Sequence, residues 1–208
     1  MCRLIWLARN SVIFRNEFSS PLLIVNKVQH IWNEGPIQYK KKSSRIIQQP
    51  TFQHDVSIGY FDGASQDGGS RCGVGAILIT PLLGRFNIKW NCGVGTNTRS
   101  ELLALWSILH FARSLGIDSI QIAGDSRIIV DWFKGIFHLE AVLLTYWMDR
   151  IMQLKNQFVE ISIQHVYREN NVDADLLSKQ ALAGPVGHFL VAHGDGRDPS
   201  AYKFYGSF

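Results

Sequence analysis

The stretch VSIGYFDGAS (56–65) decides the fold class, because it joins a strand pattern to an acidic side chain. Val56, Ile58 and Tyr60 occupy every second position, which is typical of a half-buried β-strand. We expect this strand to stop at Asp62, which forms a turn dipeptide with the glycine after it. An aspartate at the end of a strand is therefore the first candidate for a functional side chain.

The sequence after this strand predicts further strands and then helices. An apolar run at 74–79 and an alternating segment at 86–90 follow through short, glycine-containing connections, so the first three strands should form an antiparallel meander. The pattern then predicts a helix from residue 98 to about 115, a strand at 120–123, helices at 126–133 and about 140–156, a strand at 159–163 and a helix from about 172 to 183. Strands reached through helical crossovers should lie parallel to the first strand. The predicted fold is α/β, a five-stranded mixed sheet with three antiparallel and then two parallel strands, flanked by helices.

Composition divides the chain into four segments. Residues 1–35 are apolar at loosely helical spacing, and residues 36–53 form a basic linker that contains Lys40, Lys41, Lys42 and Arg45. Residues 54–183 form the folded domain, and residues 184–208 are expected to be a flexible tail. His193 and Asp195 in this tail are interpreted as parts of a flexible end and not as metal ligands.

The whole-chain composition fits a folded intracellular protein. Of 208 residues, 46% are hydrophobic and 18% are charged, and the formal net charge of +4 is too small to identify a polyanionic partner. Cys2, Cys72 and Cys92 show no paired spacing, so we expect no disulfide partner and a reducing compartment, nuclear or cytoplasmic. No apolar run approaches the roughly 20 residues of a membrane helix, and the start is a poor signal peptide. We therefore expect a soluble monomer without membrane contact.

Four acidic residues are predicted near the ends of elements. Asp62 and Asp125 end two strands expected to be parallel neighbours, while Glu101 and Asp175 lie in the first turns of two helices, so their carboxylates could converge. Such a cluster needs counter-charge, which two Mg²⁺ or Mn²⁺ ions about 3.5–4 Å apart can supply during phosphodiester cleavage. Each residue also has a structural explanation: a turn for Asp62, a helix cap for Asp125, the helix dipole for Asp175, and for Glu101 a capping box that begins at Thr98.

Five segments resemble the ordered motifs of the ribonuclease H family. They are YFDGAS (60–65), GVGAIL (73–78), TNTRSELLAL (96–105), IAGDS (122–126) and HVYRENNVDADLLSK (165–179). The similarity covers residues 54–183 and is greatest to the plant form found in non-LTR retrotransposon reverse transcriptases and their stand-alone relatives. It implies an RNase H-like fold and an endonuclease that hydrolyses the RNA strand of an RNA–DNA hybrid with two metal ions.

The resemblance also implies a role for each acidic residue. Asp62 would be shared by both metals, Asp175 would hold the metal that activates water, and Glu101 and Asp125 would hold the metal beside the leaving group. His165 occupies the family's position on a loop beside the site, where an imidazole can move protons. A histidine at a strand end bonded to backbone is an equally weighted alternative.

Substrate contacts are implied at two loops and two arginines. Members of this family bind the minor groove of the hybrid and sense the 2′-hydroxyl group. The matching positions are Gly63, Ala64, Ser65, Asn97 and Thr98, with Arg99 and Arg168 placed to pair with phosphates. Surface ion pairs are the alternative for both arginines.

Two departures from the family pattern affect substrate binding and origin. The connection at 135–140 lacks the basic, tryptophan-containing helix of many bacterial members, so we expect weak, salt-sensitive binding unless the segment from Lys40 to Arg45 substitutes. The segment IWLARNSVIF (5–14) resembles the region upstream of the nuclease domain in plant retroelement polyproteins. A catalytically silent nucleic-acid-binding remnant and a related nuclease acting on DNA are therefore the alternatives to a ribonuclease H.

Overall fold

The structure is a computed structural model that describes residues 20–26, 49–53, 55–136, 138–139 and 142–207. The chain separates into two compact units, Met1–Ile46 and Ile47–Phe208. In the first unit residues 21–26 are helical, and Pro21 takes the opening position, where its missing N–H costs nothing. The rest of the predicted helical segment and most of the basic linker lie outside the described residues. Within the described part, none of the helices combines the length and apolarity that crossing a bilayer requires.

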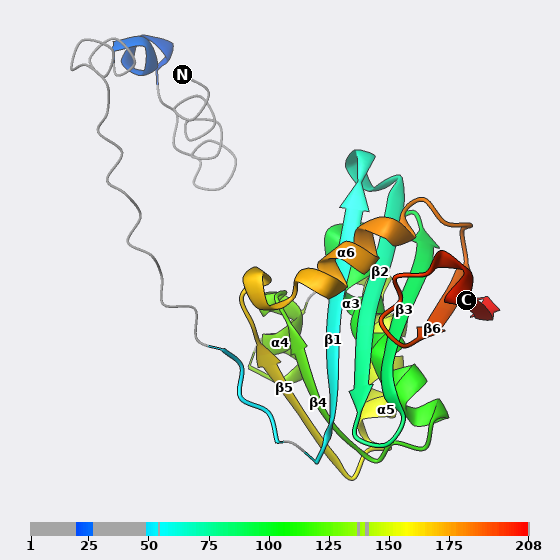
Figure 1. The fold of residues 1–208 in the computed structure, drawn as a ribbon. Coiled ribbons are helices and arrows are strands. Elements are labelled where there is room, and N and C mark those ends of the chain that lie inside the picture. The colour runs from blue at the N-terminus through cyan, green and yellow to red at the C-terminus, as the bar shows by residue number, and fades with distance from the viewer. Residues whose placement is uncertain (1–19, 27–48, 54, 137, 140–141, 208) are drawn as a thin grey trace. The chain divides into compact units, whose positions relative to one another are not determined.

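The second unit is built on one mixed sheet of seven strands in the order β5-β4-β1-β2-β3-β6-β7 (Figure 1). The first three strands form the predicted antiparallel meander, and β4 and β5 lie parallel to β1. The strands are β1 (Ser57–Gln66), β2 (Arg71–Thr80), β3 (Gly84–Gly93), β4 (Ser119–Gly124), β5 (Glu160–His165), β6 (His188–His193) and β7 (Lys203–Ser207).

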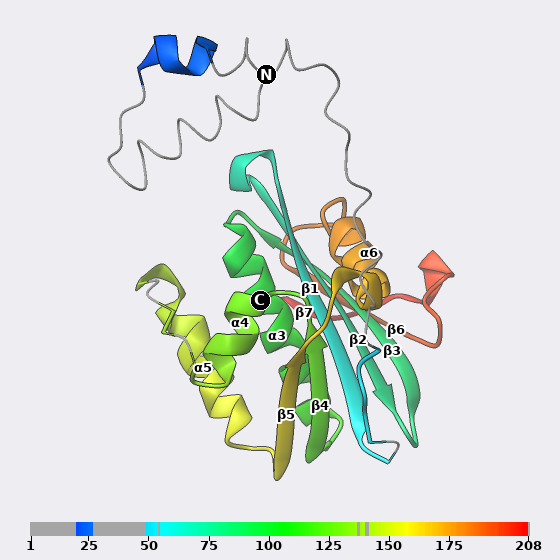
Figure 2. The same cartoon turned by 90° about the vertical axis from the view of Figure 1, so that its left-hand side faces the viewer.

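The helices cover both faces of this sheet. Helix α6 lies on one face, and α3, α4 and α5 lie on the other (Figures 1 and 2). The main core lies between the sheet and α3, where Trp90, Trp106 and Phe189 are almost fully buried. The α-helices are α3 (Asn97–Ser114), α4 (Arg127–Phe133), α5 (Thr145–Lys155) and α6 (Val172–Ala181), and the short 3₁₀ helices are η1 (Asp67–Gly69), η2 (Val142–Leu144), η3 (Arg168–Asn170) and η4 (Pro199–Ala201).

Two predictions about the end of the chain were wrong. The sheet has seven strands and not five, and the segment 184–208 contains β6 and β7 instead of a flexible tail. Strand β6 pairs antiparallel with β3 and places Phe189 against Trp90 in the core, so its apolar alternation is the reason it folds. His193 contacts the carbonyl of Leu83 at 2.6 Å and packs on a phenylalanine ring.

The remaining element predictions differ only at boundaries. The helix expected at 140–156 begins as α5 at Thr145, after the short η2. Cys72 and Cys92 are buried with free thiols, and Cys2 lies outside the described residues. Burial raises the pKa of the Cys92 thiol to about 12, so it is not ionised at neutral pH.

Candidate active site

Asp62 lies where the parallel part of the sheet ends. The pairing of β1 with β4 stops at Phe61 and Gly124, whereas its pairing with β2 continues to Gln66. The predicted strand end at Asp62 was therefore wrong, because the antiparallel hairpin carries β1 onward. One side of Asp62 is held by β2, and the other side faces Asp125, the first residue after β4.

Two glycines allow helices to approach Asp62 from both faces of the sheet. A Cβ on Gly63 would lie 2.2 Å from the backbone nitrogen of Glu101, so only glycine permits α3 to pack this closely. Gly75 lies opposite Asp62 on β2, and a Cβ there would be 2.3 Å from the carbonyl oxygen of Ala174 in α6. The close packing of both helices at these glycines places Glu101 and the residues of α6 beside the end of β4.

The structure brings three of the four predicted carboxylates together. Asp62, Glu101 and Asp125 each offer a carboxylate oxygen, and these oxygens all lie within 4.8 Å of one another. Asp62 and Glu101 are 5% and 6% exposed, so solvent screens their charges weakly. The Ser178 hydroxyl donates to Asp62 Oδ2 at 2.5 Å, and Glu101 Oε2 is buried with no hydrogen-bond partner in the described part of the chain.

The charges of this trio are only partly balanced by the protein, because Arg168, whose charge lowers the pKa of Glu101, forms its ion pair with Asp175. Burial raises the pKa of Asp62 to about 7; the hydrogen bond from Ser178 lowers it, while Asp125 and Asp175 raise it further. Burial and the charges of Asp62 and Asp125 also raise the pKa of Glu101 well above its ordinary value. Three acidic oxygens, one of them unpartnered, fit a hard divalent cation, which takes oxygen ligands and would supply the missing positive charge.

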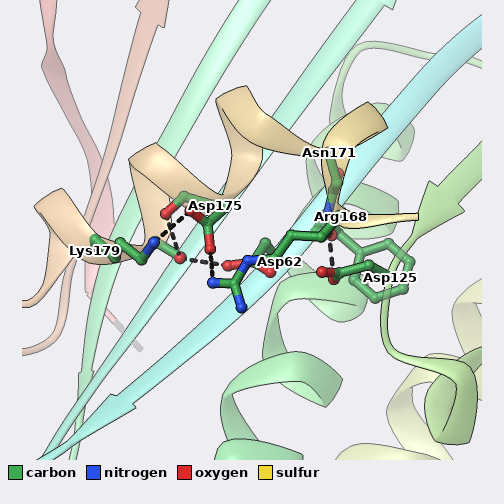
Figure 3. A network of polar contacts seen from close by, with 8 residues as sticks. Asp62, Asp125, Arg168, Asn171, Asp175 and Lys179 are labelled. Atoms are coloured by element: carbon green, nitrogen blue, oxygen red, sulfur yellow. Dashed lines mark hydrogen bonds and ion pairs between the residues drawn. The ribbon is translucent and has the colours of Figure 1, made fainter. Parts of the chain in front are cut away.

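Asp175 differs from the trio because two cations of the protein already pair with it. Figure 3 shows Asp175 between Lys179 and the guanidinium of Arg168, with Asp62 beside them. Lys179 Nζ donates to Asp175 Oδ2 at 2.5 Å, and Arg168 forms an ion pair with the other oxygen. Although partial burial would raise the pKa of Asp175, the bonds from Lys179 and Arg168 lower it overall. In this structure Arg168 follows the alternative interpretation, an ion pair, and does not lie free for a phosphate.

The helix starts remove two of the alternative explanations. The N-cap of α3 is Thr96, whose hydroxyl accepts from the backbone N–H of Arg99 at 3.2 Å, so the predicted capping box beginning at Thr98 was wrong. Glu101 is therefore not used to cap the helix, and its side chain is available to the acidic trio. Ser126, and not Asp125, precedes the first residue of α4.

His165 does not line the pocket formed by the carboxylates. It is the last residue of β5 and pairs with Gly124. Its Nε2 lies 3.2 Å from the carbonyl oxygen of Asp125, and its ring lies 5.8 Å from that of Tyr167. This arrangement is that of the alternative interpretation, a histidine at a strand end bonded to backbone.

The predicted substrate-binding residues divide into two groups. A pocket of about 190 Å³ holds all four acidic residues, and Gly63, Ala64, Ser65, Asn97 and Arg168 also line it. Thr98 and Arg99 are not among the residues that line this pocket. The Arg99 guanidinium donates to the carbonyl of Cys92 at 2.9 Å, so it is engaged with the end of β3.

Three polar residues of the site were not among the site residues that the sequence predicted. Asn171, 2% exposed, donates through Nδ2 to the carbonyl of Phe61 at 2.9 Å and to Asp125 Oδ1 at 3.3 Å, which joins the start of α6 to both strands (Figure 3). Ser178 and Lys179 follow Asp175 by three and four residues. Helical spacing alone puts such residues on one face, and this signal could have found them.

A mixed sheet with buried carboxylates beside the end of a parallel strand defines an α/β protein with a site suited to divalent cations. The model of the family described as "Reverse transcriptase-like" matches residues 60–181. The chain belongs to this family, which has the ribonuclease H-like fold.

Relatives with known names agree with this assignment. Ribonuclease HI of Halobacterium salinarum is 32% identical over 124 residues, which are 59% of this chain and 62% of that protein. The crystal structure of RNase H1 from the same organism has a TM-score of 0.57 and 31% identity, covering 61% of this chain and 96% of that one. The N-terminal RNase H domain of a Mycobacterium tuberculosis protein has a TM-score of 0.58 and 26% identity, covering 61% and 92%. The chain thus spans about three fifths of the length of the curated relative, and strands β6 and β7 lie beyond the residues that the family model matches.

Proposed function

We propose that the protein is a ribonuclease H that cuts the RNA strand of an RNA–DNA hybrid with the help of two divalent metal ions, Mg²⁺ or Mn²⁺. The observation that carries the proposal is the trio Asp62, Glu101 and Asp125, whose carboxylate oxygens lie within 4.8 Å of one another, with Asp62 and Glu101 buried. The family and the ribonuclease names of the relatives support the reaction type. LC11-RNase H1, 23% identical and with a TM-score of 0.56, was solved in complex with an RNA/DNA hybrid.

The proposed mechanism gives each side chain a task. The metal ions would be held by Asp62, Glu101, Asp125 and Asp175, and they would supply Lewis-acid stabilisation of the phosphate and of its leaving oxygen. Ser178 orients Asp62 through its hydroxyl, and Asn171 orients Asp125 through its amide.

The cations and the histidine beside the site serve the substrate in this proposal. Arg168 and Lys179 already lie at the pocket, where they can contact the phosphates of the RNA strand once Asp175 binds metal. His165, whose Nε2 lies 3.2 Å from the Asp125 carbonyl oxygen, is proposed to move protons from beside the pocket. Gly63, Ala64, Ser65 and Asn97, with Thr98 and Arg99 on the next loop, are proposed to bind the minor groove of the hybrid.

The test is cleavage of a labelled hybrid with Mg²⁺ by the wild type, by Asp62→Asn and by the control Asp67→Asn. Asp67 is exposed at the tip of the β1–β2 hairpin, outside the acidic pocket. We expect Mg²⁺-dependent cleavage by the wild type and the control and none by Asp62→Asn. Absence of cleavage by the wild type, or full activity of Asp62→Asn, would refute the proposal.

A second candidate is a catalytically silent nucleic-acid-binding protein. One observation favours it: Asp175 is neutralised by Arg168 and Lys179, so it does not add a fourth free carboxylate to the trio. Such a protein would bind hybrid without turnover at any Mg²⁺ concentration. A panel of RNA–DNA hybrid, duplex DNA and duplex RNA also separates a related DNA nuclease. The ribonuclease H proposal also includes an origin in a plant retroelement and an intracellular, monomeric protein. These parts of the proposal rest on the motif resemblance and on the cysteine pattern.

A further inference from the structure

A second hollow lies on the face of the sheet that carries α6, separate from the acidic pocket. It measures about 650 Å³, against about 190 Å³ for the acidic pocket, and no lining residue is shared. Its floor is β3, one wall is α6, and the other wall is the connection from β6 to β7, which lies on the same face as α6 (Figure 1). We call this hollow the β3 groove; it is lined by Arg85, Asn87, Lys89, Asp173, Leu176, Leu177, Gln180, Ala183, Asp195, Gly196, Arg197 and Tyr202.

The β3 groove is a feature of the chain beyond the family match. The matched region ends at residue 181, and the second wall begins at Asp195. This wall is anchored, because the amide of Asn87, 1% exposed, donates to the carbonyl of Gly194 at 2.7 Å. The groove therefore exists because β6 and β7 fold onto β3.

The β3 groove is lined by one more cationic side chain than carboxylates. Arg85 pairs with Asp173 at 2.8 Å, and Arg197 pairs with Asp195 at 3.2 Å. Lys89 has no carboxylate within ion-pair distance among the described residues. Its Nζ lies 3.5 Å from the centre of the Tyr202 ring, and burial lowers its pKa. A partly desolvated ammonium group at the floor of a groove favours an anionic ligand.

We propose that the β3 groove binds a phosphate monoester of nucleotide size. Its volume falls in the range of small-molecule sites, roughly 300–1,000 Å³. The phosphate would lie between Lys89 on the floor and Arg197 on the rim. The Arg197 side chain is 88% exposed, and its surface ion pair is weak enough to exchange for a phosphate. The organic part would lie against Leu176 and Leu177 of α6.

This proposal is independent of hybrid cleavage and is tested by calorimetric binding of AMP to the full chain in EDTA. EDTA removes divalent cations, so in the acidic pocket only Arg168 and Lys179 could attract the phosphate of AMP, and both already pair with Asp175. We expect one bound AMP per chain, and at least about tenfold weaker binding of adenosine, which lacks the phosphate. Lys89→Met keeps an apolar stem on Tyr202 but removes the charge, and it should weaken AMP binding about tenfold or more. Arg197→Gln should weaken it severalfold.

The control is Lys203→Met, an exposed lysine of β7 outside the groove, which should bind AMP like the wild type. A 5′-phosphorylated oligonucleotide that binds as tightly as AMP would identify the end of a strand as a source of the phosphate, whereas AMP alone indicates a free nucleotide. The proposal is overturned if the wild type does not bind AMP, if adenosine binds equally well, or if Lys89→Met, folded by circular dichroism, binds like Lys203→Met. Loss of binding in Lys179→Met would also overturn it, because AMP would then occupy the acidic pocket, which Lys179 lines. If Lys89→Met does not fold, the proposal is tested by the other two measurements. It is then overturned if adenosine binds as well as AMP or if Arg197→Gln binds AMP like the wild type.

Discussion

Replacing Asp62 by asparagine should abolish hybrid cleavage and, without divalent ions, stabilise the fold at neutral pH. The amide keeps an oxygen that can accept from the Ser178 hydroxyl, which contacts Asp62 at 2.5 Å, but it carries no charge. In the wild type the folded state binds the Asp62 proton more tightly than the unfolded state, because its pKa rises from 3.8 to about 7 on folding. The wild type therefore loses stability as the pH rises through this window, and the asparagine variant does not.

The size of the stability difference depends on how many pH units of the range between the unfolded and folded pKa values of Asp62 are crossed. Between about pH 5.5 and the folded pKa of about 7 lie roughly 1.5 pH units, each worth about 1.4 kcal/mol. The stability advantage of Asp62→Asn over the wild type should thus grow by about 2 kcal/mol from about pH 5.5 to about pH 8 and then stay constant. The substitution also removes the Asp62 charge that raises the pKa of Glu101, which acts in the same direction.

The assay is urea unfolding in EDTA at several pH values for the wild type, Asp62→Asn and the exposed control Asp67→Asn. A second series with Mg²⁺ should stabilise the wild type more than Asp62→Asn, because the ion binds the folded carboxylates. An advantage of Asp62→Asn that is the same at about pH 5.5 and about pH 8 would refute the assigned pKa and the unbalanced trio. Equal stabilisation of both proteins by Mg²⁺ would refute Asp62 as a metal ligand.

Other expectations follow from single contacts. Asn171→Ala should lower kcat for hybrid cleavage by roughly tenfold or more with little change in KM, because Phe61 and Asp125 lose a shared donor; unchanged kcat in a steady-state assay would contradict this. Gly75→Ala should lower the unfolding free energy by about 1–3 kcal/mol, since its Cβ would meet α6 at 2.3 Å, and wild-type stability in urea would contradict it. Phe189→Ala should cost about 3–5 kcal/mol in the same assay, a loss that a flexible tail would not show. Glutamine at the four basic positions of 40–45 should weaken hybrid binding and flatten its salt dependence in a fluorescence-anisotropy titration, and an unchanged slope would exclude this segment as a phosphate contact.

The sequence predicted the elements whose pattern is local. The alternation of Val56, Ile58 and Tyr60 predicted β1, and the helical spacing after residue 98 predicted α3. Both faces of β1 are covered, and the alternate positions, Ser57, Gly59 and Phe61, are the more deeply buried ones. Strand β6 was missed because the glycines at 194 and 196 suggested disorder, although Phe189 and Val191 already alternate. Those glycines belong to the connection between β6 and β7 and do not weaken the strand.

The acidic site was predictable in its members but not in its charge balance. Asp62, Glu101, Asp125 and Asp175 all line one pocket. Asp62 lies within a strand because β2 pairs with β1 beyond this residue. Glu101 is free of capping because the N-cap of α3 is Thr96, two residues before the cap that was proposed. Both are tertiary or boundary effects, which periodicity does not determine.

The pairing of β6 with β3 also bears on aggregation. Strand β3 is ten residues long and carries buried apolar side chains, so without β6 it would present a long free edge, the kind of edge that recruits strands from other molecules. The added strands move that side's edge to β7, which has five residues, begins with Lys203 and pairs through an irregular register. A chain cut after residue 183 would therefore keep its acidic residues but be expected to associate edge to edge during expression.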